Sequence, residues 1–121
     1  MFERMKALRA RLRELSEIDE MTEHDLVDLG LSREQMKALI TIPRDVADRV
    51  ARMAEIFGVD PRDLTADRSG YVDILCNCAG CKARVECAHE MAKGEDADPE
   101  NCGFCVNAGS FALLSAQPAK V

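Results

Sequence analysis

Four cysteines within twelve residues, from Cys76 to Cys87, constrain this chain more than any other stretch of its sequence. Their spacing is C-x-C-x2-C-x5-C, and a separate C-x2-C pair, Cys102 and Cys105, follows after fourteen intervening residues. Thiolates are soft ligands that prefer zinc, iron–sulfur clusters or copper(I) to hard cations. We therefore expect a fold that brings these two segments together around one metal centre.

The cellular compartment decides whether disulfides compete with metal binding. Residues 1–6 lack the apolar run of a signal peptide, and no stretch is long and apolar enough to span a membrane. We expect a cytoplasmic protein, in which thiols stay reduced. The formal net charge of −6 argues against nonspecific nucleic-acid binding by the surface as a whole.

The rest of the chain indicates an all-α fold. Only four of its 121 residues are proline and seven are glycine, and apolar residues recur at helical spacing. No alternating pattern longer than four residues favours a strand. We expect a compact bundle of five or six helices with a four-cysteine metal site towards the C-terminus, in residues 69–116.

An amphipathic helix is expected over residues 3–15. Its narrow apolar stripe consists of Met5, Leu8, Leu12 and Leu15. Residues 1–14 hold five basic and two acidic side chains, a net charge of +3, whereas residues 15–30 hold six acidic side chains and no lysine or arginine. We expect an amphipathic basic helix within residues 1–20 that protrudes from a helical domain spanning residues 21–121.

Two interpretations of this basic helix stay open. The first is a solvated helix whose charges face its own acidic neighbour. The second is a helix that docks a protein partner, with RNA or an anionic membrane surface as weaker alternatives.

Capping residues mark the next helices. Thr22 is expected to cap one helix, with Asp25 three residues later, and Ser32 to cap another, with Gln35 completing a capping box. Gly30 between them suits a helix C-terminus.

Further helices follow from the same signals. Pro43 is expected to open the longest helix, and Gly58 to end it. Three more are expected from about residue 69 into the cysteines, over residues 88–93 and over residues 103–115.

Six thiols exceed the four ligands of one centre. Cys78 and Cys81 form a C-x2-C turn, and the x5 step brings a third thiol, Cys87, from the residues beyond. The fourth ligand is expected from the C-terminal pair, where Cys105 lies between apolar residues. The predicted ligands are Cys78, Cys81, Cys87 and Cys105.

Two cysteines and both histidines receive no ligand role. Cys76 lies two residues before Cys78 and would face another side of a helix, and Cys102 follows a polar loop and is expected to be exposed. His24 and His89 lack metal-like partner spacing. The chain has no Gly-rich phosphate loop, G-x-S-x-G or H-E-x-x-H, so we predict no catalytic residues and do not expect an enzyme.

The run from Cys78 to Cys87 resembles the C-x2-C-x5-C end of the cluster loop in iron–sulfur DNA glycosylases. Those enzymes carry a further cysteine seven positions earlier, where this chain has Tyr71. Nothing else in the chain looks like a glycosylase. The resemblance therefore implies a [4Fe–4S] cluster geometry and no repair chemistry.

A longer stretch, from about Ala54 to Leu114, resembles an uncharacterised alphaproteobacterial family of small cysteine-containing proteins. Its pattern is M-x-x-[LF]-G-[VI]-D, then C-x2-C-x5-C, then F-C-P-N-A before an apolar helix. Phe57-Gly58-Val59-Asp60 and the sequence from Phe104 to Ala108 match it, with Val106 in place of the proline. The family pattern contains the same four cysteines and implies no biochemical function.

The stretch from Leu15 to Arg33 resembles a short domain of unknown function found in small arginine-rich bacterial proteins. Its pattern is an acidic helix followed by D-[IL]-G-[IL]-S-R, which here is residues 28–33. Some members are linked to RNA or to regulation, so the resemblance implies RNA as a partner. The acidic character of the matched segment argues against phosphate contact.

Two functions are therefore expected. The first is a small cytoplasmic [4Fe–4S] protein that senses redox state or iron, or passes electrons. The alternative is a structural zinc-binding module whose N-terminal helix binds a protein or RNA partner. The x5 step favours the cluster, because pairing two C-x2-C motifs around zinc would leave Cys87 unexplained.

Overall fold

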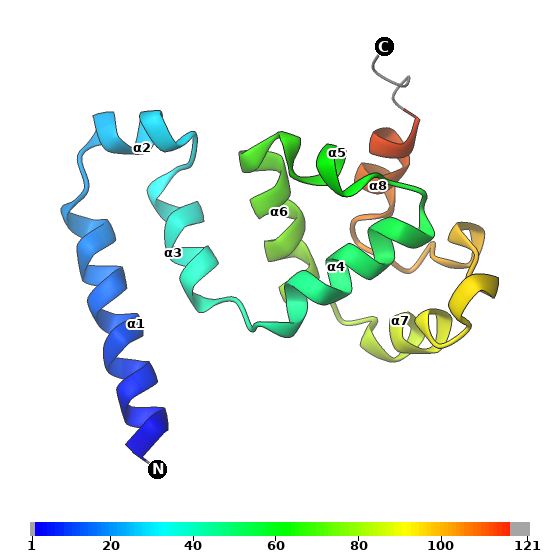
Figure 1. Cartoon of the computed structure of the whole chain (residues 1–121), viewed down its shortest axis with the longest axis horizontal. Coiled ribbons are helices and arrows are strands. Elements are labelled where there is room, and N and C mark those ends of the chain that lie inside the picture. The colour runs from blue at the N-terminus through cyan, green and yellow to red at the C-terminus, as the bar shows by residue number, and fades with distance from the viewer. Residues whose placement is uncertain (1, 117–121) are drawn as a thin grey trace. The chain divides into compact units, whose positions relative to one another are not determined.

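The computed structural model describes residues 2–116, in which every regular element is a helix. Eight α-helices and two short 3-10 helices follow one another in this part of the chain (Figure 1). Their bounds are α1 Phe2–Glu20, α2 Glu23–Leu29, α3 Arg33–Thr41, α4 Asp45–Ile56, α5 Pro61–Ala66, α6 Arg68–Ala79, α7 Arg84–Met91, η1 Gly94–Asp96, η2 Pro99–Asn101 and α8 Ala108–Ser115. The all-α prediction is confirmed, and the predicted number of five or six helices is too low.

The chain divides between Ile42 and Pro43 into two compact units. The first contains α1 to α3, and the second contains α4 to α8 with both 3-10 helices. The boundary expected from the sequence lies after residue 20. In the structure α1 packs on α3, so the end of α1 belongs with the residues that follow it.

In the first unit, α1 is anchored only by its C-terminal end. Ile18 is its one buried residue, and Leu15 is half-buried. Residues 2–14 are all exposed. The other buried side chains of the unit are Leu26 and Leu31, so its core is small.

The predicted caps in the first unit are confirmed. The Thr22 hydroxyl accepts a hydrogen bond from the Asp25 backbone N–H at 3.1 Å, and the Ser32 hydroxyl accepts one from Gln35 at 3.0 Å. Both are full capping boxes, since the side chains of Asp25 and Gln35 accept from the cap residues in return. Gly30 ends α2 with a φ of 73°, which glycine adopts without strain.

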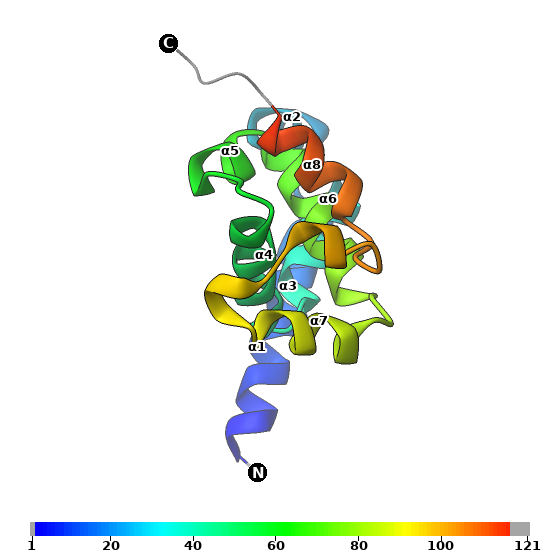
Figure 2. The same ribbon diagram turned by 90° about the vertical axis from the view of Figure 1, so that its right-hand side faces the viewer.

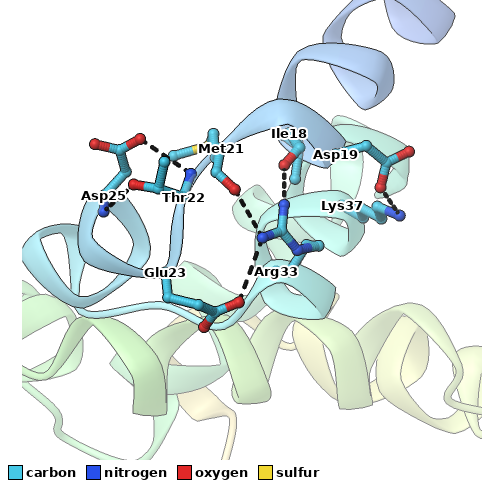
Figure 3. A network of polar contacts seen from close by, with 8 residues as sticks. All are labelled: Ile18, Asp19, Met21, Thr22, Glu23, Asp25, Arg33 and Lys37. Carbon is cyan, nitrogen blue, oxygen red and sulfur yellow. Dashed lines mark hydrogen bonds and ion pairs between the residues drawn. The ribbon is translucent and has the colours of Figure 1, made fainter.

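Arg33 fastens the end of α1 to the start of α3 (Figure 3). Its guanidinium donates to the carbonyl oxygen of Ile18 and, at 2.7 Å, to that of Met21. An ion pair between Lys37 and Asp19 lies beside it. A helix C-terminus leaves carbonyl oxygens unpaired and carries partial negative charge, so a cation there is favourable.

The second unit is built on the packing of α4 against α6. The predicted stripe on α4 is largely confirmed, since Val46, Val50 and Met53 are buried. Phe57 at its end is half-buried, and its ring lies 5.5 Å from that of Phe111 in α8. With twelve residues α4 is shorter than α1, which has nineteen, so the prediction that it is the longest helix is wrong.

The last helix starts later than predicted. α8 begins at Ala108, whereas the sequence indicated a start near residue 103. Residues 102–107 form turns that follow η2 and lead into α8 (Figure 2). Cys105 therefore lies on a turn and not in a helix. None of the helices in the described part of the chain is long and apolar enough to cross a membrane.

Candidate metal centre

The four predicted cysteines line one cavity in the second unit. Cys78 comes from the last turn of α6, Cys81 from the turn after it, Cys87 from α7 and Cys105 from the turn before α8. The remaining lining residues are Arg49, Val50 and Met53 of α4, with Phe104, Val106, Asn107 and Phe111. The fold thus gathers four thiols from four separate segments.

Local hydrogen bonds explain how each C-x2-C presents its thiols. The backbone N–H of Cys81 donates to the Cys78 carbonyl at 3.1 Å, which closes a turn where α6 ends. The backbone N–H of Cys105 donates in the same way to Cys102 at 3.0 Å. The x5 step works differently, because α7 starts within it and carries Cys87 in its first turns.

Burial and the neighbouring thiols favour the protonated form of Cys78, Cys87 and Cys105 by raising the pKa of each. Burial is the main cause that raises the pKa of Cys78, Cys87 and Cys105. Neighbouring thiols of the same cavity raise each of these pKa values further, so the four groups are close enough to repel one another as thiolates. A cationic guest would remove this penalty, since metals bind the deprotonated thiol.

Hydrogen-bond donors are directed at the sulfur atoms. The backbone N–H of Ala83 donates to Cys81 Sγ at 3.4 Å. A hydrogen bond from the backbone N–H of Asn107 lowers the pKa of Cys105, against the larger effect of burial. Such N–H donors stabilise negative charge on sulfur, and they are a common second layer around thiolate-bound metals.

Arg49 is the one cation in the lining, and its place there was not predicted from the sequence. Its positive charge lowers the pKa of both Cys78 and Cys87. Its Nη1 lies 3.8 Å from an oxygen of Asp45 but is buried without a hydrogen-bond partner. The available signal was its position three residues after Val46, on the apolar face of α4.

The thiols share a cavity without converging on one point. Among residues 2–116, no group of three or more His, Cys, Asp or Glu side chains lies close enough together to hold one metal ion. Tetrahedral zinc, with Zn–S bonds of about 2.3 Å, would require its sulfurs to lie about 3.8 Å apart. The cavity itself is small, ≈ 20 Å³, which is space for about one water molecule. The predicted ligands are neighbours that do not form a closed metal site.

The two cysteines without a predicted ligand role lie outside this lining. Cys102 is fully buried, so the expectation that it is exposed is wrong. Its thiol donates to the Asp98 carbonyl oxygen at 3.5 Å, as a neutral S–H does. Burial, and then Asp73, raise the pKa of Cys76. All six cysteines are free thiols.

Glu90 explains why the loop before Cys102 folds inward. This carboxylate is only 3% exposed, and it accepts from Lys93 Nζ at 2.8 Å and from the Asp98 backbone N–H at 2.9 Å. The hydrogen bond from Lys93 is the main cause that lowers its pKa. A polar sequence between residues 93 and 101 therefore packs around a buried acid instead of projecting into solvent.

Asn107 connects two of the elements that line the thiol cavity. Its side chain is 2% exposed; Nδ2 donates to the Ile74 carbonyl oxygen at 2.9 Å, and Oδ1 accepts from Asn77 Nδ2 at 3.2 Å. Ile74 and Asn77 belong to α6, the helix that carries Cys78. Asn107 therefore holds the turn with Cys105 against the helix with Cys78.

Comparison with known families follows the division of the chain. Residues 36–117 match the model of a family of unknown function (DUF6455), over more than half of the chain and including all six cysteines. Residues 1–36 match a YjiS-like domain. Both resemblances inferred from the sequence, to a family of unknown function and to a short N-terminal domain, are thereby confirmed. No curated protein and no solved structure matches the chain.

Proposed function

The chain belongs to a family of unknown function (DUF6455), and we propose that it is a small iron–sulfur protein whose [4Fe–4S] cluster is bound by Cys78, Cys81, Cys87 and Cys105. The observation that carries this proposal is their shared cavity, to which four segments of the chain each contribute one thiol. Four cysteine thiolates are the usual ligand set of such a cluster.

The spacing of the thiols supports a cluster over a single zinc ion. Each iron of a [4Fe–4S] cluster takes one thiolate, so the four sulfurs surround a body of several atoms and need not meet at a point. The small volume of ≈ 20 Å³ is the observation that favours zinc. A cluster must therefore displace side chains outward, whereas zinc must draw the sulfurs inward.

The polar groups around the cavity suit an anionic guest. A [4Fe–4S]²⁺ core with four thiolates carries a net charge of about −2. The buried Nη1 of Arg49, which has no acceptor, and the N–H groups of Ala83 and Asn107 can donate to its sulfurs. A buried donor without a partner lowers the free energy of unfolding by about 1–3 kcal/mol, and an anionic group bound in the cavity offsets that loss.

The partial exposure of the site favours a redox or sensing role. When bound, a cluster of this type supplies one-electron chemistry. Cys78, Cys81 and Cys105 are half-buried, and only Cys87 is buried, so an oxidant or an electron-transfer partner has access to the thiols. Arg49 and the backbone donors would set the potential through charge and hydrogen bonding.

Metal and sulfide analysis of protein purified without oxygen tests the proposal. We expect a brown protein with about four iron and four sulfide per chain. Cys78→Ser and Cys105→Ser should lower both contents strongly. Cys76→Ser is the matched control, because it alters a thiol of the same helix that does not line the cavity, and it should keep the cluster. A colourless protein with one zinc per chain would refute the cluster and support the zinc-binding alternative.

A further inference from the structure

Half of α1 has no packing partner within its own unit. Residues 2–14 are all exposed, including Met5, Leu8 and Leu12 of the predicted apolar stripe; Leu8 and Leu12 are each 56% exposed. Phe2, which precedes the stripe, is 81% exposed. An isolated helix of this length is only marginally stable in water, because nucleation is unfavourable and a short helix forms few hydrogen bonds to offset it. This segment gains stability if its apolar stripe docks on another surface.

The second unit contains an acidic groove, defined here by Asp63, Leu64, Asp67, Tyr71, Ile74 and Leu113 as its principal lining residues. It is lined by residues of α5, α6 and α8 and of the link between α5 and α6, and it has a volume of ≈ 340 Å³. That volume is within the range of natural ligand pockets. Asp73 adds a third carboxylate, and no lysine or arginine belongs to the described lining. Leu113 is 73% exposed, so apolar surface remains open to solvent.

These two surfaces complement each other in charge and polarity. The exposed half of α1 combines an apolar stripe with five basic side chains and two acidic ones. The acidic groove combines apolar side chains with three carboxylates. An amphipathic helix that lays its apolar face into such a groove is a recurrent mode of protein recognition.

We propose that α1 of one copy of this chain docks in the acidic groove of a second copy. Leu8 and Leu12, one helical turn apart, enter the apolar part of the groove, and basic residues such as Arg9 and Arg13 face its carboxylates. The contact joins different surfaces on the two copies, so it is head-to-tail. The proposal stands whether or not the four thiols bind a cluster.

The chain contains its own reporter for this contact. Tyr71 is the only tyrosine, the chain has no tryptophan, and Tyr71 lines the groove. Sedimentation of the full chain should show concentration-dependent self-association, accompanied by a change in tyrosine fluorescence. Raising the salt concentration should weaken both, since screened charges contribute to the contact.

Charge reversal tests which surfaces meet. Arg9→Glu with Arg13→Glu, and separately Asp63→Arg, should each weaken self-association about tenfold. Mixing the two variants should restore association. The helix variant keeps the acidic groove and the groove variant keeps the basic helix, so the two unchanged surfaces can still meet. Lys82→Glu, an exposed reversal outside both surfaces, is the matched control and should associate normally. Circular dichroism verifies that each variant remains helical.

Three outcomes would overturn the proposal. A chain that stays monomeric at every concentration has no such contact, even if tyrosine fluorescence indicates docking of α1 within one molecule. Association that survives both charge reversals uses other surfaces. Binding of the wild-type chain to phosphatidylglycerol vesicles without self-association would assign the helix to an anionic membrane surface.

Discussion

Replacing Asn107 tests how the fold holds the four thiols together. Asn107→Ala removes two side-chain hydrogen bonds, of 2.9 Å to the Ile74 carbonyl and 3.2 Å from Asn77, at a residue that is 2% exposed. Each buried bond contributes about 1 kcal/mol, and the small cavity left by the amide adds to the loss. We expect the free energy of unfolding of the second unit to fall by about 2–3 kcal/mol.

Urea denaturation followed by tyrosine fluorescence measures this change, because Tyr71, the only tyrosine, lies in the second unit. Asn77→Ala is the control: it removes only the 3.2 Å bond, from an exposed residue, and should cost less than about 1 kcal/mol. Iron and sulfide contents should fall more in Asn107→Ala than in Asn77→Ala. Equal losses in the two variants, or a change within about 0.5 kcal/mol for Asn107→Ala, would refute a tie between the helix and the turn.

Asn107→Asp adds a pH dependence with a definite sign. The new carboxyl would be buried and would face the carbonyl oxygen of Ile74, so its pKa should rise above the ordinary value. An acid whose pKa is raised on folding destabilises the fold above its unfolded pKa. The variant should therefore recover stability, relative to Asn107→Ala, as the pH falls below the raised pKa. A loss that does not change with pH would contradict this account.

Three further predictions address charged residues. Arg49→Met should lower the reduction potential of the proposed cluster by roughly 40 mV per kcal/mol of lost charge interaction, measured by spectroelectrochemical titration, whereas Arg49→Lys should change it less. Arg33→Ala should lower the free energy of unfolding of the first unit by about 2 kcal/mol, because two charge-assisted hydrogen bonds are lost. The loss should be measurable as faster amide hydrogen exchange at residues 15–20, and unchanged exchange would contradict the role of Arg33. Glu90→Gln should lower the melting temperature at neutral pH. Because the pKa of Glu90 is lowered in the fold, this difference should vanish as the pH drops below 4.5 and through the lowered pKa, and a constant difference would argue against it.

Short-range chemistry made much of the fold predictable from the sequence. The caps at Thr22 and Ser32 depend only on residues up to three positions away, so the sequence alone predicts them. The buried stripe of α4 follows from helical periodicity alone. Cysteine spacing and the apolar neighbours of Cys105 pointed to four thiols, and these line one cavity; their role as metal ligands stays a prediction.

Interactions between distant residues account for the errors. Cys102 follows a polar loop, but the buried carboxylate of Glu90 draws that loop inward. The apolar spacing from Phe104 onward suggested an early start for α8, yet residues up to Asn107 form turns, and the Asn107 side chain bonds to α6. The place of Arg49 among the thiols likewise depends on how α4 packs against α6.

The hydrogen bond between Asn77 and Asn107 joins residues of two different spaces. Asn107 lines the cavity of the four thiols, while Asn77 and Ile74 line the acidic groove. A ligand that binds in one space and alters the hydrogen bond between Asn77 and Asn107 changes the free energy of binding in the other space. Thermodynamic linkage makes the effect reciprocal: whatever factor the thiol site imposes on affinity in the groove, an occupant of the groove imposes on the thiol site.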